Sequence, residues 1–441
     1  MKNFNSIISM PRLLSFLLAS TLSQISVCAD DRGGWINFSE ALKQYADGSD
    51  EVIEAFKLRQ QEKTLENREL AIEMLERARA KGNPCAYLLL SPFEQNPANK
   101  VELIRYAYDH KISAAIYPLA DALYQHGRGN EADYQEALEL FIHAGQQTHK
   151  DAQFYAGRMY HFGHGTEKDF VAARDWYKRA VESGSVRAAN NLANLWADGD
   201  GGEADLVKAM EYFQYASDKG MAMASYNLGN KYRTKVTNCP DYTNALKYYQ
   251  MAIDQAKADK WNYAEANYWV GWIYLYGKGV DVDVDKARRL LEAAAEGEFE
   301  RAYFTLGWFY DSGKGGVPDP RKANDYYQLA AASGHVQAMS NLAWNLWELN
   351  GDSAMPEALP YFLTAVEKGN TNAMTNFGYL NLYRKWPGAD DNYGLKLSLE
   401  AAGKGSRQAM ENLFYYYDGW GELIEPDVEK AAYWKEQMHR H

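Results

Sequence analysis

Few residues in this 441-residue chain have the spacing that catalysis or metal binding requires. His161 and His164 are the tightest histidine pair, but no set of nearby carboxylates completes a metal site around them. The segment 281–285 has aspartate at alternate positions, yet it lacks the glycine and the distal glutamate of a calcium loop. Aspartates that precede a helix instead favour the positive end of the helix dipole.

Sequence motifs of enzymes are also missing. The chain contains no His-Glu-x-x-His, Cys-x-x-Cys or Gly-x-Ser-x-Gly. Its repeated Gly-x-Gly is not a phosphate loop, because no strand precedes it and no third glycine or Lys-Ser/Thr completes it. We therefore expect no enzymatic activity, no catalytic residues, no metal and no cofactor.

A repeated pair of alanines predicts the elements that position these residues. Two alanines eight residues apart occur ten times, and the second alanine advances by 36 residues in five of the nine steps. The pairs are Ala78/Ala86, Ala107/Ala115, Ala144/Ala152, Ala180/Ala188, Ala216/Ala224, Ala258/Ala266, Ala294/Ala302, Ala330/Ala338, Ala365/Ala373 and Ala401/Ala409. A period of this size predicts stacked helix pairs, a solenoid whose extended surface is typical of binding proteins.

Each repeat predicts a helix A, a turn and a helix B. Ala266, Val270 and Tyr274 form one apolar stripe of helix A, and a small residue follows the leading alanine by five positions, as at Gly271. Glycine inside a helix costs about 0.5–1 kcal/mol, so we expect the partner helix to approach closely there. Gly-x-Gly then ends helix A, and an apolar pair on helix B faces back.

The repeat that begins at Ala302 carries a resemblance to a known family. Its matching residues are Ala302, Leu306, Gly307, Tyr310, Gly313, Gly315, Lys322, Ala323, Tyr326, Tyr327, Ala330, Ala331 and Gly334. This pattern resembles the Sel1-like repeat, a relative of the tetratricopeptide repeat. The resemblance implies an all-α fold, a right-handed α/α superhelical solenoid of about ten helix-turn-helix repeats over residues 66–441, with helix A on the inner face.

Several segments depart from that pattern. Residues 86–115 have lost most of the turn between helices, residues 257–263 are an insertion, and the repeats at Ala338 and Ala373 lack Gly-x-Gly. Residues 30–65 are less regular, and we expect an irregular helical N-terminal cap in which residues 38–45 resemble an isolated helix B.

The first 29 residues predict a secretory signal peptide. Lys2 and Arg12 are its only charges, an apolar stretch follows, and residues 27–29 suit a signal peptidase. We therefore expect export to the periplasm, with full secretion or a lipid anchor on Cys28 as alternatives. No other segment is apolar enough to span a membrane. Cys85 and Cys239 lie about four repeats apart, which predicts two unbridged thiols.

The charge of the chain restricts its partners. The formal charge is −12 at pH 7, and loss of Lys2 and Arg12 with the signal would make it −14. An acidic protein is poorly suited to bind nucleic acid or to adhere to anionic lipid. We therefore expect a protein or peptide partner, or a second copy of the chain in a homodimer.

Two rows on helix A point away from the buried stripe, at the third and sixth positions after the leading alanine. The family resemblance implies that this face holds extended peptides, with asparagine matching peptide amides and aromatic side chains supplying binding energy. The predicted partner-binding residues are Asn191, Asn227, Trp272, Trp308, Asn341, Trp344, Asn376, Tyr379, Asn412 and Tyr415. The alternative is that both rows pack against the next repeat.

These observations favour an exported, non-enzymatic scaffold that binds a protein or an extended peptide on the inner helix A face. One alternative is a β-lactam-binding or β-lactam-hydrolysing exported protein, as associated with cysteine-rich Sel1-like relatives. Those relatives carry a disulfide in each repeat, which this chain lacks, and it has no Ser-x-x-Lys. Another alternative is an adaptor in the lumen of the endoplasmic reticulum, although the chain has no C-terminal retention signal.

Overall fold

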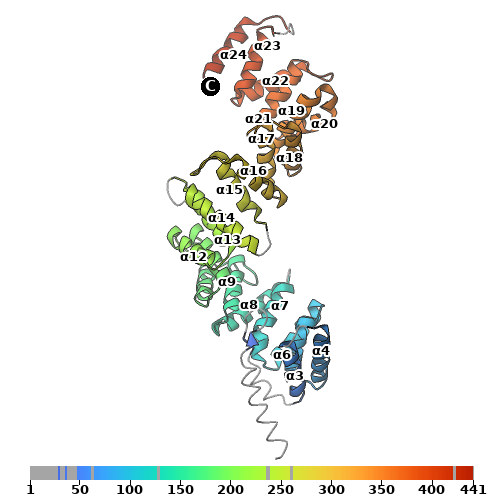
Figure 1. The fold of residues 1–441 in the computed structure, drawn as a ribbon, viewed down its shortest axis with the longest axis vertical. Helices are drawn as coiled ribbons and strands as arrows, with labels where there is room; N and C mark the ends of the chain where they lie inside the picture. Colours follow the sequence, from blue (N-terminus) through green and yellow to red (C-terminus); the bar gives the residue numbers. More distant parts are fainter. Residues whose placement is uncertain are drawn as a thin grey trace, which may run out of the picture. The chain divides into compact units, whose positions relative to one another are not determined.

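The computed structural model describes residues 28–29, 35–36, 47–60, 64–126, 130–234, 239–258, 262–420 and 424–440 (Figure 1). These residues form two compact units, Met1–Lys219 and Gly220–His441. Apart from the short antiparallel strands β1 (Cys28–Ala29) and β2 (Trp35–Ile36), the regular elements described are helices. The predicted all-α solenoid is confirmed. Most of the predicted signal peptide and the segment 38–45 lie outside the described residues.

The first unit contains five consecutive helix pairs, in which an odd-numbered helix A packs against the even-numbered helix B that follows it. Short 3-10 segments, Ser91–Phe93 and Ser113–Ala115, lie between helices. The helices are α3 (Ser49–Gln60), α4 (Leu65–Ala80), α5 (Pro84–Leu90), α6 (Pro97–Asp109), α7 (Ile116–His126), α8 (Glu131–Gln146), α9 (Lys150–Phe162), α10 (Phe170–Glu182), α11 (Val186–Asp198) and α12 (Leu206–Asp218).

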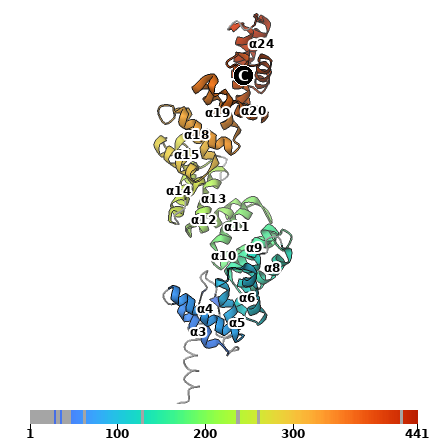
Figure 2. The ribbon, with the colours of Figure 1, turned by 90° about the vertical axis from the view of Figure 1, so that its right-hand side faces the viewer.

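The second unit continues the same arrangement, with a 3-10 segment at Gly351–Ala354 (Figure 2). Its helices are α13 (Ala222–Thr234), α14 (Tyr242–Ala258), α15 (Ala264–Tyr276), α16 (Val284–Glu296), α17 (Glu300–Asp311), α18 (Pro320–Ala332), α19 (Val336–Asn350), α20 (Met355–Glu367), α21 (Thr371–Leu382), α22 (Asp391–Gly403), α23 (Arg407–Tyr417) and α24 (Val428–Arg440).

Alanine lines the contacts between successive helices. Nineteen of the twenty paired alanines are at most 5% exposed, whereas Ala258 is exposed. The prediction that Ala258 pairs with Ala266 at a contact between helices is therefore wrong. Helix α14 has 17 residues rather than the usual 13, so part of the insertion extends it. Ala245, Ala252 and Ala256 are buried in this helix, and Ala252 follows Tyr249 by three positions, as Ala216 follows Phe213.

The predicted close approach at the helix A glycine is confirmed. A Cβ on Gly307 would lie 2.5 Å from Cδ1 of Tyr327, and one on Gly229 would lie 2.6 Å from Cδ1 of Tyr249. Both tyrosine side chains are completely buried on helix B. The glycine therefore makes room for a large ring, whose burial stabilises the helix pair more than the glycine weakens helix A.

The two glycines of the Gly-x-Gly turn after α9 have different structural roles. Gly163 ends α9 with φ of 72°, a left-handed conformation that suits glycine. Gly165 lies against the preceding repeat, since a Cβ there would meet the carbonyl carbon of Tyr134 at 2.5 Å. The turn then closes through an aspartate: Asp169 donates its N–H to the carbonyl of Tyr160 and caps α10. This turn thus contacts helices of its own repeat and of the one before.

Candidate partner-binding face

Four aromatic rings of α15 and α17 form a continuous cluster in the second unit. The ring centroids of Trp269 and Trp272 lie 6.0 Å apart, and those of Trp272 and Tyr276 lie 4.9 Å apart. Tyr276 stacks on Trp308 of the next repeat at 6.1 Å with an interplanar angle of 19°. We name these four residues the α15–α17 cluster. It joins two of the predicted binding residues across neighbouring helices A.

Two cations flank the α15–α17 cluster. The guanidinium carbon of Arg233, in the last turn of α13, lies 3.7 Å from the ring centroid of Trp269. Its Nε donates to the hydroxyl of Tyr249 at 3.0 Å, which holds the side chain in place. At the other side, Nζ of Lys314 lies 5.5 Å from the ring centroid of Trp308 and 5.7 Å from that of Tyr276.

A second aromatic cluster connects α19, α21 and the end of α23. Trp344 contacts both Trp347 and Tyr379, with ring centroids 5.2 Å and 6.4 Å away. The chain of contacts continues from Tyr379 through Tyr383 to Trp420 and Tyr415, with successive centroids 5.0, 5.7 and 6.2 Å apart. We name these six residues the α19–α23 cluster, namely Trp344, Trp347, Tyr379, Tyr383, Tyr415 and Trp420.

The predicted aromatic row is accessible from solvent. Trp272, Trp308, Trp344 and Tyr379 are half-buried, and Tyr415 is 41% exposed. These side chains therefore contact one another and their neighbours in sequence while part of each remains open. Their role in binding a partner stays a prediction.

Sequence reasoning missed the residues that connect this row. Tyr276, Trp347, Tyr383 and Trp420 contact the predicted aromatics. The signal was present for three of them, since Tyr276 and Tyr383 follow a row residue by four positions and Trp347 follows one by three, the spacing of neighbours on one helix face. Trp420 gave no such signal, because it lies beyond the end of α23.

Several asparagines of the second row bond to the protein itself. Nδ2 of Asn191 donates to the Tyr177 hydroxyl at 3.2 Å, and Nδ2 of Asn341 donates to the Tyr327 hydroxyl at 2.9 Å. Asn412 is 7% exposed. For these positions the structure favours the alternative of contacts within the solenoid. Asn227 and Asn376 are half-buried, and amide recognition by this row stays a prediction.

The Asn341 contact belongs to a larger polar network. The Tyr327 hydroxyl donates onward to Oδ2 of Asp311 at 3.2 Å, and Nδ2 of Asn345 donates to Oδ1 of the same carboxylate at 2.9 Å. Burial, together with the nearby Asp311 charge, raises the pKa of Tyr327 above its usual value, so its hydroxyl remains a donor. This network connects three consecutive helices, α17, α18 and α19.

The histidine pair does not form a joint site. Nδ1 of His161 lies 3.4 Å from the Tyr177 hydroxyl, whereas Nδ1 of His164 lies 3.1 Å from the Tyr124 hydroxyl. Burial lowers the pKa of both imidazoles, which favours their neutral forms. Within the described ranges, no three His, Cys, Asp or Glu residues are grouped to hold a metal ion.

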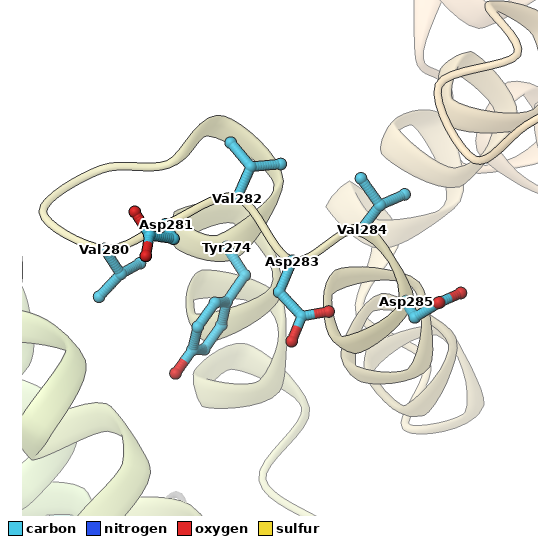
Figure 3. A pocket seen from close by; sticks show the side chains of 7 residues that line it. All are labelled: Tyr274, Val280, Asp281, Val282, Asp283, Val284 and Asp285. Carbon is cyan, nitrogen blue, oxygen red and sulfur yellow. The ribbon is translucent and has the colours of Figure 1, made fainter.

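The aspartates of 281–285 surround the start of α16 (Figure 3). Asp283 caps this helix by accepting the N–H of Lys286 at 2.9 Å, as the helix-dipole hypothesis predicts. Figure 3 shows the Asp281 and Asp285 carboxylates pointing away from one another, on either side of Asp283. The hollow beside them is lined by Tyr274 and residues 280–285. It belongs to the turn between helices rather than to a site with converging carboxylates.

The two remaining thiols are separate, as expected. Cys85 is completely buried in the first unit, and burial raises its pKa to about 12. Cys239 is exposed, and neither cysteine is in a disulfide. Cys85 therefore packs as a small apolar side chain.

Helix pairs with a repeated spacing of glycine, tyrosine and capping aspartate define the chain as an α-solenoid repeat protein. The Sel1 repeat pattern matches residues 60–83, 113–149, 150–185, 186–221, 222–257, 264–298, 301–335 and 407–437, which make up more than half of the chain. The chain belongs to the Sel1 repeat family. The unmatched segments contain the repeats that depart from the pattern, yet α5–α6, α19–α20 and α21–α22 still form helix pairs there.

Similarity to a solved structure with a TM-score of 0.71 supports the same fold. The chain is similar to c5321, a protective antigen of uropathogenic Escherichia coli with an SLR fold, at 24% identity and a TM-score of 0.71, covering 90% of this chain and 86% of that one. It is also similar to a Sel1 repeat protein from Oxalobacter formigenes, at 28% identity and a TM-score of 0.47, over 56% of this chain and 98% of that one. None of the curated protein sequences compared with the chain matches it.

Members of this family share a general function. Sel1 repeat proteins generally act as protein-interaction scaffolds and are typically non-catalytic adaptors. Among the described residues, no helix is both long and apolar enough to cross a membrane.

Proposed function

We propose that this protein is an exported, non-enzymatic scaffold that binds a protein or an extended peptide across helices A of its second unit. The anchors of the proposed face are Trp272, Trp308, Trp344, Tyr379 and Tyr415. One observation carries the proposal: these side chains, from five successive helices A, stay partly exposed while contacting aromatic neighbours. Partly exposed aromatic rows of this kind are typical of interaction sites.

The packing of the anchors favours binding. Aromatic side chains provide much of the affinity at protein interfaces when a partner excludes water from them. Trp272 is held between Trp269 and Tyr276, and Trp344 contacts Trp347 and Tyr379. A side chain already held by its neighbours loses little conformational entropy when a partner binds.

Export is part of the proposal because of the features of residues 1–29. The periplasm is the proposed location, and full secretion is the alternative. β-Lactam binding or hydrolysis and an adaptor role in the endoplasmic reticulum remain competing hypotheses, which a nitrocefin assay and a localisation experiment address. A second copy of this chain is one protein partner that the aromatic face could bind.

The proposed function is tested by capture of partners from an envelope extract. The chain and a variant with Trp272→Ala, Trp308→Ala and Trp344→Ala are immobilised in equal amounts, and bound proteins are quantified by mass spectrometry. We expect at least one protein to be retained by the chain and lost from the variant. Equal capture by both would contradict binding at this face.

A matched control separates loss of the face from loss of the fold. Trp196 is also a half-buried tryptophan of a helix A, but it lies in the first unit between the cations Arg174 and Lys208. We expect Trp196→Ala to retain the captured protein. Circular dichroism of all variants checks that helix content is unchanged.

A further inference from the structure

We infer that the α15–α17 cluster binds an extended acidic peptide, with an apolar segment of the peptide on the rings and a carboxylate at each end. This inference rests on the proposed binding face and specifies its ligand. It depends on Arg233 and Lys314, which flank Trp269, Trp272, Tyr276 and Trp308.

Neither flanking cation has a carboxylate partner within the part of the chain that the structure describes. The contacts of Arg233 are the Trp269 ring and the Tyr249 hydroxyl, and those of Lys314 are the rings of Trp308 and Tyr276. Some other cations that lie over rings do have such partners, as Arg187 has Asp151 and Lys208 has Asp205, whereas others, such as Arg174 over Trp196, have no ion pair among the described residues.

The position of the charges suits a ligand carboxylate. Arg233 is half-buried and held by its hydrogen bond, so its guanidinium is preorganised. Charge-assisted hydrogen bonds to carboxylate are stronger than those between neutral groups. In a protein of formal charge −12, this part of the face has a cation at each end of a cluster of four connected aromatic rings. The local charge therefore selects against a basic peptide.

The spacing of the helices sets the length of the ligand. Helix axes in contact lie about 10 Å apart, and the cations belong to α13 and to the turn after α17, with α15 between them. An extended chain covers about 3.3 Å per residue, so roughly six residues lie between the two carboxylates. Leucine, proline and phenylalanine in that segment would suit the aromatic rings.

The test uses the full chain and two synthetic peptides with a fluorescent label. The acidic probe is acetyl-Glu-Leu-Pro-Phe-Leu-Pro-Leu-Glu-amide, and the neutral probe has glutamine in place of both glutamates. Fluorescence anisotropy gives the dissociation constants. We expect the acidic probe to bind about tenfold more tightly, the gain expected when one charge-assisted contact replaces a neutral one. Since exposed charges are screened by salt, the difference should shrink in about 0.5 M NaCl.

Substitutions then assign the preference to the two cations. Lys314→Gln should reduce the preference for the acidic probe several-fold, and Arg233→Gln should reduce it further, whereas Arg233→Lys retains the charge and part of the preference. Arg289→Gln is the matched control, because it removes one exposed positive charge from α16 of the same unit. Lys314 is exposed, so its substitution keeps the test valid even if Arg233→Gln destabilises the fold.

Failure of this inference can be separated from failure of the proposed function. If both probes bind equally and Trp308→Ala abolishes their binding, the aromatic face is a binding site but not one for acidic peptides. If the acidic probe binds independently of Trp308, or if neither probe binds, the α15–α17 cluster is not the site inferred here. The capture experiment then tests the proposed function independently of this inference.

Discussion

At the scale of residues, a large side chain on helix B limits which residue fits at the facing position of helix A. Gly307 lies on helix A where the ring of Tyr327 from helix B needs space. The hydroxyl of that tyrosine receives a bond from Asn341 of the following helix A. A single tyrosine thus connects its own repeat with the next one, and both contacts can be tested by substitution.

Substitution of the close glycine should destabilise the protein. For Gly307→Ala, overpacking against Tyr327 should exceed the gain in helix propensity, for a net loss of about 1–2 kcal/mol in the free energy of unfolding. Urea denaturation followed by circular dichroism measures this change. Gly403→Ala is the control: this glycine also lies in a helix, α22, but an added Cβ meets no atom within 4 Å. A stabilised or unchanged Gly307→Ala protein would contradict the packing argument.

Substitution can also show whether the asparagine row stabilises the solenoid or is available to contact a peptide. We expect Asn341→Ala to lower the free energy of unfolding by about 1 kcal/mol, because the substitution removes the bond to the buried Tyr327 hydroxyl. A double-mutant cycle with Tyr327→Phe measures the coupling between the two side chains. If the cycle shows no coupling, the bond contributes nothing to stability, and Asn341 is available for the predicted peptide contact.

Particular residues show which contacts could be predicted from the sequence at this scale and which could not. The spacing predicts the contact of Gly307, because a glycine inside a helix needs a physical reason. It cannot reveal that Asn341 bonds to Tyr327, since the two belong to different helices and their contact depends on how those helices pack. The cations of the α15–α17 cluster were missed for the same reason: Arg233 and Trp269 are neighbours only after α13 and α15 align.

At the scale of elements, aspartate starts most helices B from α10 onward. Asp205, Asp283 and Asp319 each accept the N–H of a lysine three residues later. The same aspartates donate their own N–H to a carbonyl of the preceding helix A. The sequence predicted a helix start for the aspartates of 281–285, but the closure of the turn onto helix A required the structure.

The capping aspartates should make stability depend on pH. The backbone N–H of Lys208 lowers the pKa of Asp205, and the N–H of Asn244 lowers that of Asp241. A carboxyl whose pKa is lowered by folding stabilises the protein above its unfolded pKa, about 3.9. This stabilisation is lost as the pH falls through the lower, folded pKa. We therefore expect the thermal midpoint to fall as the pH is lowered from about 5 to 3.

Asparagine provides a control for this prediction, because it caps a helix but does not titrate. The variant with Asp205→Asn and Asp241→Asn should show a flatter dependence of the thermal midpoint on pH than the unmodified protein. Parallel profiles for the two proteins would mean that other groups cause the acid sensitivity.

At the scale of the whole molecule, the alanine period predicted the solenoid and most helix pairs, because stacked helices need a small residue at each contact. It placed Ala258 wrongly, since part of the insertion lengthened α14 and Ala258 lies exposed at the end of that helix. The aromatic row was predicted from the sequence, but the sequence could not show that its side chains join into clusters across neighbouring helices.

Export is a prediction for the whole chain. When the full sequence is expressed in a bacterial host, we expect the periplasmic fraction to contain a protein that begins at Asp30, because residues 27–29 suit signal peptidase. Intact-protein mass spectrometry determines the start. A full-length protein confined to the cytoplasm would contradict export, whereas a lipid on Cys28 would support the membrane-anchored alternative.

The central claim, that helices A of the second unit present the partner-binding face, is tested most directly by photocrosslinking. A benzophenone amino acid replaces Tyr276, which is 39% exposed in the α15–α17 cluster, or Leu329, which is 48% exposed on helix B α18. After irradiation in envelope extract, we predict a specific protein adduct from position 276 and none from position 329. Adducts from position 329 alone, or the same adducts from both positions, would contradict the claim.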